Sequence, residues 1–263
     1  MKFYVVSDLH LDMHTIRKDH WYDFERDAIL FLAGDSANGL AAMAYVKNIL
    51  CKHFRAVVMV AGNHEWYSNK NRLYRMNPYA FQKESINNVD YATVIKNSPL
   101  VKLKAHSKKI DNLYFLDNEL IEIEGFKIYG GSLWFPIHTY SAEIITEYEE
   151  LMNDAKFINY RIIEEQYKAF IDNFPTKVDL VISHHLPCHE AFALEKNANS
   201  EYALFYHASL SHELISSARY WIAGHQHEAI EKKIAGGKTT FISNPKGAIS
   251  MHPGLLSNKK YFL

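Results

Sequence analysis

Short apolar runs recur along the chain, and each is followed at once by a glycine or a polar residue. The runs are rich in β-branched and aromatic residues, which is typical of strands buried on both faces. Between two of them, residues 40–54 place Leu40, Met43, Val46 and Leu50 at helical spacing, mainly on one face. Strands that alternate with helices favour βαβ units and a parallel sheet. The predicted buried strands are residues 3–6, 29–33, 56–61, 180–183 and 220–223.

The middle and the end of the chain show a different pattern, in which apolar and polar positions alternate and turn residues intervene. Alternation of this kind predicts antiparallel hairpins. Residues 141–173 are charged but carry apolar residues at helical spacing, which predicts one or two helices that cover the sheet. We therefore predict an α/β fold in which two mixed sheets form a sandwich with helices outside. The predicted hairpin strands are residues 113–116, 120–123, 126–129, 230–235 and 239–243, with turns at Asp117-Asn118, Glu124-Gly125 and Gly236-Gly237.

Composition narrows the class of protein. The chain has 263 residues, of which 48% are hydrophobic, so it can bury a substantial core. No repeat or Gly/Ser linker marks a boundary, and we predict one domain over residues 1–263. The formal net charge of −1 does not imply a nucleic-acid partner, although it leaves one open. No stretch approaches the roughly 20 apolar residues that span a bilayer, so we expect a cytoplasmic protein without a membrane partner.

Polar clusters follow the predicted strands. In open α/β sheets the carboxyl ends of parallel strands are where ligands bind, so these clusters are expected to meet. The Asp8-x-His10 and His225-x-His227 pairs each place two side chains on the same side of an extended segment, where they can hold one ion. The clusters are Ser7-Asp8-Leu9-His10, Gly34-Asp35, Gly62-Asn63-His64-Glu65, Ser183-His184-His185 and Gly224-His225-Gln226-His227.

A single cluster of this kind has ordinary explanations. An isolated Asp-x-His is more often a surface or capping arrangement, and a Gly-Asn pair favours an ordinary turn. Five clusters, each directly after a strand-like run, are a stronger signal and predict a metal site. Carboxylate, imidazole and amide ligands together suit manganese, iron or zinc. The glycines at 34, 62 and 224 would let the backbone turn sharply and allow close approach of neighbouring side chains.

The order of these motifs resembles that of the calcineurin-like metallophosphoesterase superfamily, and further motifs resemble a bacterial and phage subgroup of it. The resemblance extends from residue 3 to about residue 247. It implies a four-layer α/β/β/α sandwich, which agrees with the mixed strand pattern. The family motifs are Asp8-x-His10, Gly34-Asp35, Gly62-Asn63-His64-Glu65, His184 and Gly224-His225-x-His227, and the subgroup motifs span residues 115–118, 130–134 and 244–247.

The resemblance also implies a cofactor and its ligands. The cofactor would be two divalent metal ions per chain, with manganese expected first and iron, zinc or nickel as alternatives. Glu65 stands where many members have aspartate, at a position that is not a direct ligand. Carried over by motif, one ion would be held by Asp8, His10, Asp35 and His227, and the other by Asp35, Asn63, His184 and His225, with Asp35 as the bridge.

The mechanism that we hypothesise uses a metal-bridging hydroxide to attack phosphorus, with Asp35 holding both ions. His64 follows the ligand Asn63 in sequence and would protonate the leaving group as general acid. The expected reaction is hydrolysis of a phosphodiester in a small or nucleotide-like substrate. A phosphomonoesterase or a phosphoprotein phosphatase would use the same metal chemistry and stays open. A silent metal-binding scaffold is less favoured, since every ligand and the acid are present.

Substrate contacts are harder to place. Arg72, with nearby basic residues and with Tyr67, could bind phosphate and stack a base, and His185 could contact the substrate. A solvated surface segment explains the basic stretch at least as well, and His185 could simply pack. Residues 69–109 are the most irregular part of the chain, and we predict a lid or an insertion there.

Overall fold

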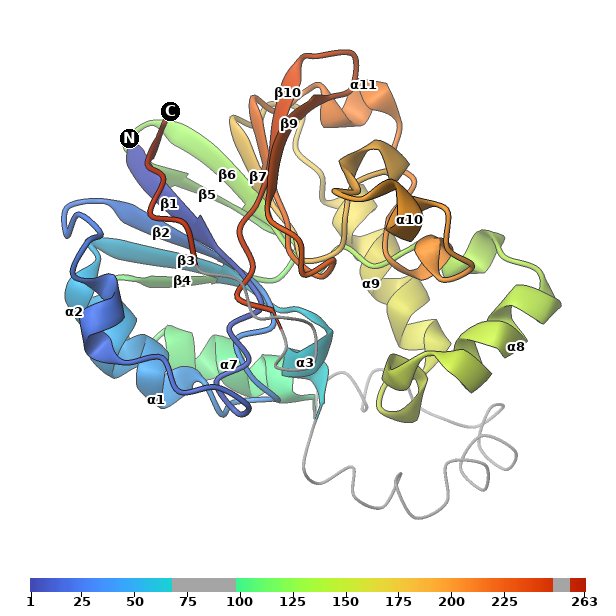
Figure 1. The fold of residues 1–263 in the computed structure, drawn as a ribbon, viewed down its shortest axis with the longest axis horizontal. Coiled ribbons are helices and arrows are strands. Elements are labelled where there is room, and N and C mark those ends of the chain that lie inside the picture. Colours follow the sequence, from blue (N-terminus) through green and yellow to red (C-terminus); the bar gives the residue numbers. More distant parts are fainter. Residues whose placement is uncertain (68–97, 248–255) are drawn as a thin grey trace.

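The computed structural model describes residues 1–67, 98–247 and 256–263, which form two sheets packed face to face with helices on both outer sides (Figure 1). In the first sheet four strands run parallel, and a C-terminal strand joins the edge in the antiparallel direction. In order across this sheet, the strands are β11 (Tyr261–Phe262), β1 (Lys2–Val6), β2 (Ile29–Ala33), β3 (Ala56–Val60) and β4 (Leu113–Leu116).

The second sheet is mixed in the same way. Its central strands are parallel, and each edge strand is antiparallel to the neighbour with which it forms a hairpin. Both faces are covered, as parallel sheets require. In order across this sheet, the strands are β5 (Glu119–Ile123), β6 (Phe126–Gly130), β7 (Leu180–Ile182), β8 (Tyr220–Ile222), β10 (Thr239–Ser243) and β9 (Ile230–Ile234).

Helical segments line the outer faces of the sheets. Figure 1 shows α1, α2 and α7 along the first sheet and α9 beside the second. The segments are η1 (Lys18–Trp21), α1 (Met43–Tyr45), η2 (Val46–Leu50), α2 (Cys51–His53), α3 (Asn63–Trp66), α7 (Pro99–Ser107), η4 (Ile137–Thr139), α8 (Ala142–Leu151), η5 (Asn153–Lys156), α9 (Tyr160–Asp172), η6 (His189–Ala191), α10 (Glu195–Ala198), η7 (Ala203–Phe205) and α11 (His212–Ile215).

Three apolar layers hold this sandwich together, and β1 shows how one strand contributes to two of them. Phe3 and Val5 point into the space between the sheets, whereas Tyr4 and Val6 point towards the helices of the first sheet. All four are at most 2% exposed, and burying such side chains contributes about 1.5–3 kcal/mol each. A third apolar cluster lies between the second sheet and its helices. The predicted α/β fold with two mixed sheets and flanking helices is confirmed.

Two helices cover the stretch for which one or two were predicted. The side chain of Asn159 accepts a hydrogen bond from the backbone N–H of Arg161 and so caps the start of α9. Ile162 and Phe170 are buried on the inner face of this helix, opposite its charged residues. The helix predicted at 40–54 is present as the continuous run α1, η2 and α2, with a π-helical middle.

One strand pairing differs from the prediction. Residues 113–116 form β4, which pairs in parallel with β3 in the first sheet and not as a hairpin with β5. The chain crosses to the second sheet at residues 117–118, where Asn118 adopts a φ of 59°. The prediction was wrong because β4 is an edge strand, in which Tyr114 is 37% exposed between the buried Leu113 and Phe115. Buried and exposed positions therefore alternate as in a hairpin strand, although the pairing is parallel. The other two hairpins, β5–β6 and β9–β10, are confirmed.

Residues 69–97 of the predicted lid or insertion, Arg72 among them, lie outside the described residues. The remainder of that segment contains α7, whose Leu100 and Leu103 are buried in the core beneath the first sheet. Across residues 1–67, 98–247 and 256–263, no helix has the length and apolar character that crossing a bilayer would require.

Candidate metal centre

Polar side chains from both sheets meet beyond the carboxyl ends of the parallel strands. Asp8 follows β1, Asp35 follows β2 and Asn63 follows β3, while His184 and His225 follow β7 and β8. Ligand atoms within each of two groups lie within 4.8 Å of one another, which is the spacing around a single metal ion. The two groups are Asp8, His10, Asp35 and His227, and Asp35, His184 and His225, so that Asp35 belongs to both.

The backbone turns sharply at these residues. Asp8, His10, Asp35, His225 and His227 all adopt φ values between 43° and 68°. Residues other than glycine seldom occupy this region, and each such residue costs roughly 1–3 kcal/mol. Hydrogen bonds hold the turns in place: the N–H of Asp8 donates to the Gly34 carbonyl, and that of His10 to the Asp35 carbonyl, each at 3.0 Å. The surrounding fold therefore imposes the conformation of these side chains.

Glycines make room for the cluster, as the sequence predicted. A Cβ atom on Gly62 would lie 2.1 Å from Oδ1 of Asp35, and one on Gly34 would lie 2.5 Å from Nδ1 of His184. A Cβ atom on Gly224 would lie 2.5 Å from Oδ2 of Asp8. Because real Cβ atoms do not approach this closely, no other residue fits at these positions without moving the cluster.

The second group fits a cation. Nδ1 of His184 is 2.9 Å from the Ala33 carbonyl, which only accepts, so a neutral His184 ring presents Nε2 as an acceptor. That Nε2 faces two more acceptors, Asn63 Oδ1 at 3.0 Å and Asp35 Oδ2 at 3.4 Å. Burial alone would lower the pKa of His184, but Asp35 outweighs it and raises this pKa to about 10. A divalent ion would supply the same positive charge to all three acceptors.

The first group is arranged similarly. Nε2 of His227 lies 3.3 Å from Nε2 of His10 and 3.3 Å from Oδ1 of Asp8. Burial would raise the pKa of Asp8, but the hydrogen bond and the charge of His227 hold that pKa below its usual value. Burial would also raise the pKa of Asp35, yet the imidazoles around it, above all His184 and His64, hold its pKa well below the usual range. Both carboxylates are therefore ionised and ready to bind a cation.

Glu65 organises the loop that carries Asp35. Its carboxylate accepts hydrogen bonds from the backbone N–H groups of Asp35 at 2.9 Å, Ser36 at 2.7 Å and Gly62 at 2.7 Å. Burial and the charge of Asp35 raise the pKa of Glu65 to about 7, although the N–H donors act in the opposite direction. This side chain links the loops after β2 and β3 and does not belong to either metal-binding group.

His64 lies beside the cluster with one ring nitrogen held. Its Nδ1 is 2.9 Å from Oδ1 of Asn38, which can only accept, so Nδ1 carries a hydrogen. Its Nε2 is 3.9 Å from Oδ2 of Asp35, and the side chain is 16% exposed. Nε2 is thus the nitrogen that can exchange a proton with a bound molecule.

Two residues suggested as substrate contacts occupy different environments. His185 is fully buried, and its ring neighbours include His225, with centroids 4.3 Å apart, and Trp134 at 4.5 Å. Burial and the neighbouring His184 lower the pKa of His185 to about 3. The Tyr67 ring packs against His64 and Phe157 and is 5% exposed, so little of its surface is left to stack a base. Both rings are buried in this structure, and a contact between His185 and the substrate stays a prediction.

Sequence reasoning missed Asn38 and Asp154, which both contact site residues. Asn38 lies in the same loop as the Gly34-Asp35 motif, and its closeness to Asp35 in sequence was a usable signal. Asp154 hydrogen-bonds Asn63 from a distant helical segment, and nothing in its local sequence indicates this.

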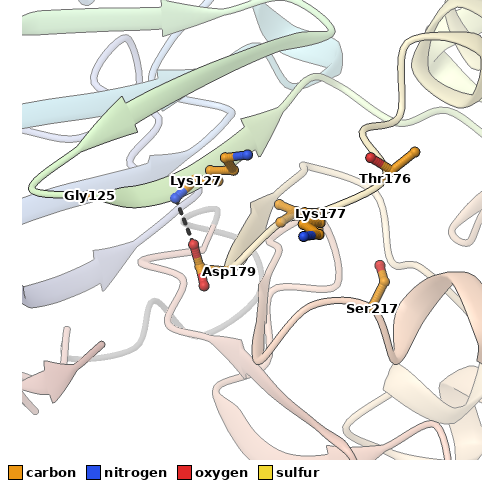
Figure 2. Close-up of a pocket in the computed structure, with 7 residues that line it drawn as sticks. Gly125, Lys127, Thr176, Lys177, Asp179 and Ser217 are labelled. Carbon is orange, nitrogen blue, oxygen red and sulfur yellow. Dashed lines mark hydrogen bonds between the residues drawn. The ribbon is translucent and has the colours of Figure 1, made fainter.

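A surface hollow lies away from the cluster, at the other end of the second sheet. Its volume is about 460 Å³, and Lys127, Thr176, Lys177, Asp179 and Ser217 are among the residues around it (Figure 2). Lys127 lies at the start of β6 and Asp179 just before β7, whereas the metal-binding groups follow the opposite ends of the strands. We assign this hollow no part in the chemistry of the site.

Solved structures of other proteins are similar to this chain. The phosphopantetheinyl hydrolase of Mycobacterium tuberculosis is similar in fold, with a TM-score of 0.68 and 14% identity over 94% of this chain and 89% of that one. A dimetal phosphatase from Danio rerio has a TM-score of 0.43 and 14% identity over 93% of this chain and 87% of that one. A comparison with curated protein sequences found no match.

The family model for calcineurin-like phosphoesterases matches residues 1–229, which confirms the resemblance inferred from the motifs. The match includes the strands and the polar clusters of both sheets up to His227. The chain therefore belongs to the calcineurin-like phosphoesterase family and is a metallophosphoesterase, a hydrolase of phosphoric esters.

Proposed function

We propose that this metallophosphoesterase is a phosphodiesterase that holds two divalent ions and acts on a small or nucleotide-like ester. The observation that carries the proposal is the convergence of two metal-binding groups on one shared carboxylate, Asp35. One ion would be held by Asp8, His10, Asp35 and His227, and the other by Asp35, Asn63, His184 and His225. Manganese is the ion that we propose first, with iron, zinc or nickel as alternatives.

When bound, the two ions supply positive charge to the phosphoryl group and acidify the attacking water. Asp35 would fix their relative position, because its carboxylate accepts a hydrogen bond from the His64 N–H and packs closely against Gly62. Its backbone is held as well, since the Asp35 N–H donates to the carboxylate of Glu65. The site thereby needs little rearrangement when the substrate binds.

The chain's own proton donor is His64. With Nδ1 held by Asn38, a protonated His64 can donate only from Nε2, which points towards the cluster. Donation to the oxygen of the departing group avoids release of a free alkoxide and typically accelerates hydrolysis by roughly 10²–10⁴. Such assistance matters most when the leaving group is a poor one, as in an alkyl or nucleoside ester.

A diester has an organic group on each side of phosphorus, and Tyr206 supports this class of substrate. Its half-buried ring packs at 4.4 Å from the ring of His225, at the edge of the second group. An aromatic surface in that position suits contact with an organic group better than contact with a phosphate oxygen. We therefore place the second organic group of the substrate against Tyr206.

The test is a substrate panel on the whole chain. Protein stripped with a chelator would be reloaded with Mn²⁺, its metal content measured, and its hydrolysis of bis-p-nitrophenyl phosphate, p-nitrophenyl phosphate and cyclic nucleotides compared. We expect two ions per chain and a higher kcat/KM for the diesters. A preference for the monoester would overturn the diester assignment in favour of a phosphomonoesterase. Two bound ions without hydrolysis of any ester would point instead to a binding scaffold.

A further inference from the structure

The orientation of the Asn63 amide decides whether it can bind a metal ion. Its oxygen and nitrogen occupy similar positions when the group rotates by half a turn, yet only the oxygen can be a ligand. In this structure Oδ1 points to Nε2 of His184, 3.0 Å away. Nδ2 points in the other direction, to Oδ1 of Asp154 at 2.8 Å and to the Tyr67 hydroxyl oxygen at 3.1 Å.

Asp154 selects this orientation because a carboxylate only accepts. It lies in η5, between α8 and α9, and is 2% exposed. The Tyr67 hydroxyl donates to the same Oδ1, so Asp154 receives both donors of this small network. Rotating the Asn63 amide would bring its oxygen against the buried carboxylate and its NH₂ group against the metal-binding atoms. The first contact would be unfavourable in a buried environment, and the second would leave no amide oxygen facing the ion.

We propose that Asp154 is a positioning residue for the second metal ion, which acts through Asn63 and touches neither the ion nor the substrate. The proposal rests on the proposed function, in which Asn63 is a ligand of that ion. It also gives the helical segment from α8 to α9 a part in metal binding. Partners of metal ligands in comparable positions typically change metal affinity by about 10–100-fold when they are removed.

The experiment compares three variants of the full chain. Asp154→Leu removes the acceptor while keeping a similar volume. Asp154→Asn keeps an acceptor but accommodates either orientation of Asn63, so the competent orientation should fall to about half and the affinity by about twofold. Asp172→Leu is the matched control, because it removes an exposed carboxylate at the end of α9. Mn²⁺ binding to chelator-stripped protein would be measured by calorimetry, with circular dichroism and thermal melting as checks of folding.

We expect Asp154→Leu to weaken the second Mn²⁺ ion by about 10–100-fold while the first binds normally. Asp154→Asn should weaken the second ion about twofold, and Asp172→Leu should match the original protein. A purely structural role would weaken both ions together and lower the melting temperature, and that result would overturn the proposal. Unchanged affinities in Asp154→Leu would overturn it as well.

A measurement on the unaltered chain covers the case in which Asp154→Leu fails to fold. The side-chain NH₂ protons of Asn63, identified by their loss in Asn63→Ala, should exchange slowly with solvent because both donate to buried oxygens. Fast exchange would contradict the network. If the original protein binds fewer than two ions, the proposed function fails whatever Asp154 does. If it binds two and hydrolyses esters while Asp154→Leu is unchanged, only the role of Asp154 fails.

Discussion

Replacing Gly62 by alanine would test whether the close packing around Asp35 sets the geometry of the metal centre. The added Cβ would lie 2.1 Å from Oδ1 of Asp35, so the carboxylate must move by about 1 Å to restore an ordinary contact. The backbone itself tolerates alanine, because φ at Gly62 is −92°. Asp35 cannot move freely, since its Oδ1 accepts from the His64 N–H at 2.9 Å and Glu65 holds its backbone.

The expected result is loss of function in a folded protein. Overpacking of this kind costs about 1–3 kcal/mol of stability, which a chain with three apolar layers should survive. A misplacement of about 1 Å in a group that positions the reaction can cost about 10²-fold in rate, so we expect kcat/KM for bis-p-nitrophenyl phosphate to fall at least that far. Metal content after dialysis should also fall, because the shared ligand is the one displaced.

Gly236→Ala is the control for this substitution. Gly236 has a φ of 66° and open space around it, so alanine there adds backbone strain of about 1–2 kcal/mol without touching the centre. Metal content and kcat/KM should be unchanged in Gly236→Ala when protein of verified fold is assayed. If Gly62→Ala keeps two ions per chain and the rate of the original protein, the reasoning from close packing is refuted.

Two further substitutions test the proton donor and the response to acid. His64→Ala should keep both ions while its turnover falls by about 10²–10⁴-fold. Asn38→Leu leaves the His64 ring unheld, so turnover should fall by about 10–100-fold, and the double variant should be no slower than His64→Ala. Metal analysis and kinetics on the same samples check both expectations. Burial lowers the pKa of His207 from 6.5 to about 4, and the Ser209 N–H donates to its Nδ1, so the folded state keeps this ring neutral. The unfolded chain then binds the extra proton, and the free energy of unfolding should fall by about 3 kcal/mol as the pH drops from 6.5 to 4. Urea unfolding of chelator-stripped His207→Phe should lack this part of the loss, and an equal loss in both proteins would contradict the assignment.

Much of the site could be predicted from sequence because its candidate metal-binding side chains directly follow the ends of strands. A continuous apolar run predicts a buried strand. The polar residues directly after such strands, such as Asp8 and Asp35, lie together at the carboxyl ends of the strands. Because the parallel strands of a sheet end at the same side, residues far apart in sequence can be predicted to meet there. The role of these side chains as metal ligands stays a prediction until the metal content is measured.

Other features depend on contacts that local patterns do not encode. Residues 113–116 alternate as a hairpin strand would, yet they form a parallel edge strand, because exposure of Tyr114 at the sheet edge gives the same pattern. Tyr67 precedes a basic stretch, which suggested a stacking surface, but its ring is 5% exposed and packs against His64 and Phe157. Asp154 lies 91 residues from Asn63, and only the folded chain shows that they meet.

The left-handed backbone at Asp8, His10, Asp35, His225 and His227 has a consequence for how the protein matures. Isolated peptides rarely adopt such conformations at five positions together, so the two metal-binding groups can form only after both sheets have assembled. In small zinc domains the ion organises the chain, whereas here we expect an already folded chain to receive it. The metal that the site binds is then decided by competition among the ions present when folding is complete. The same protein isolated from different growth media should therefore carry different metals.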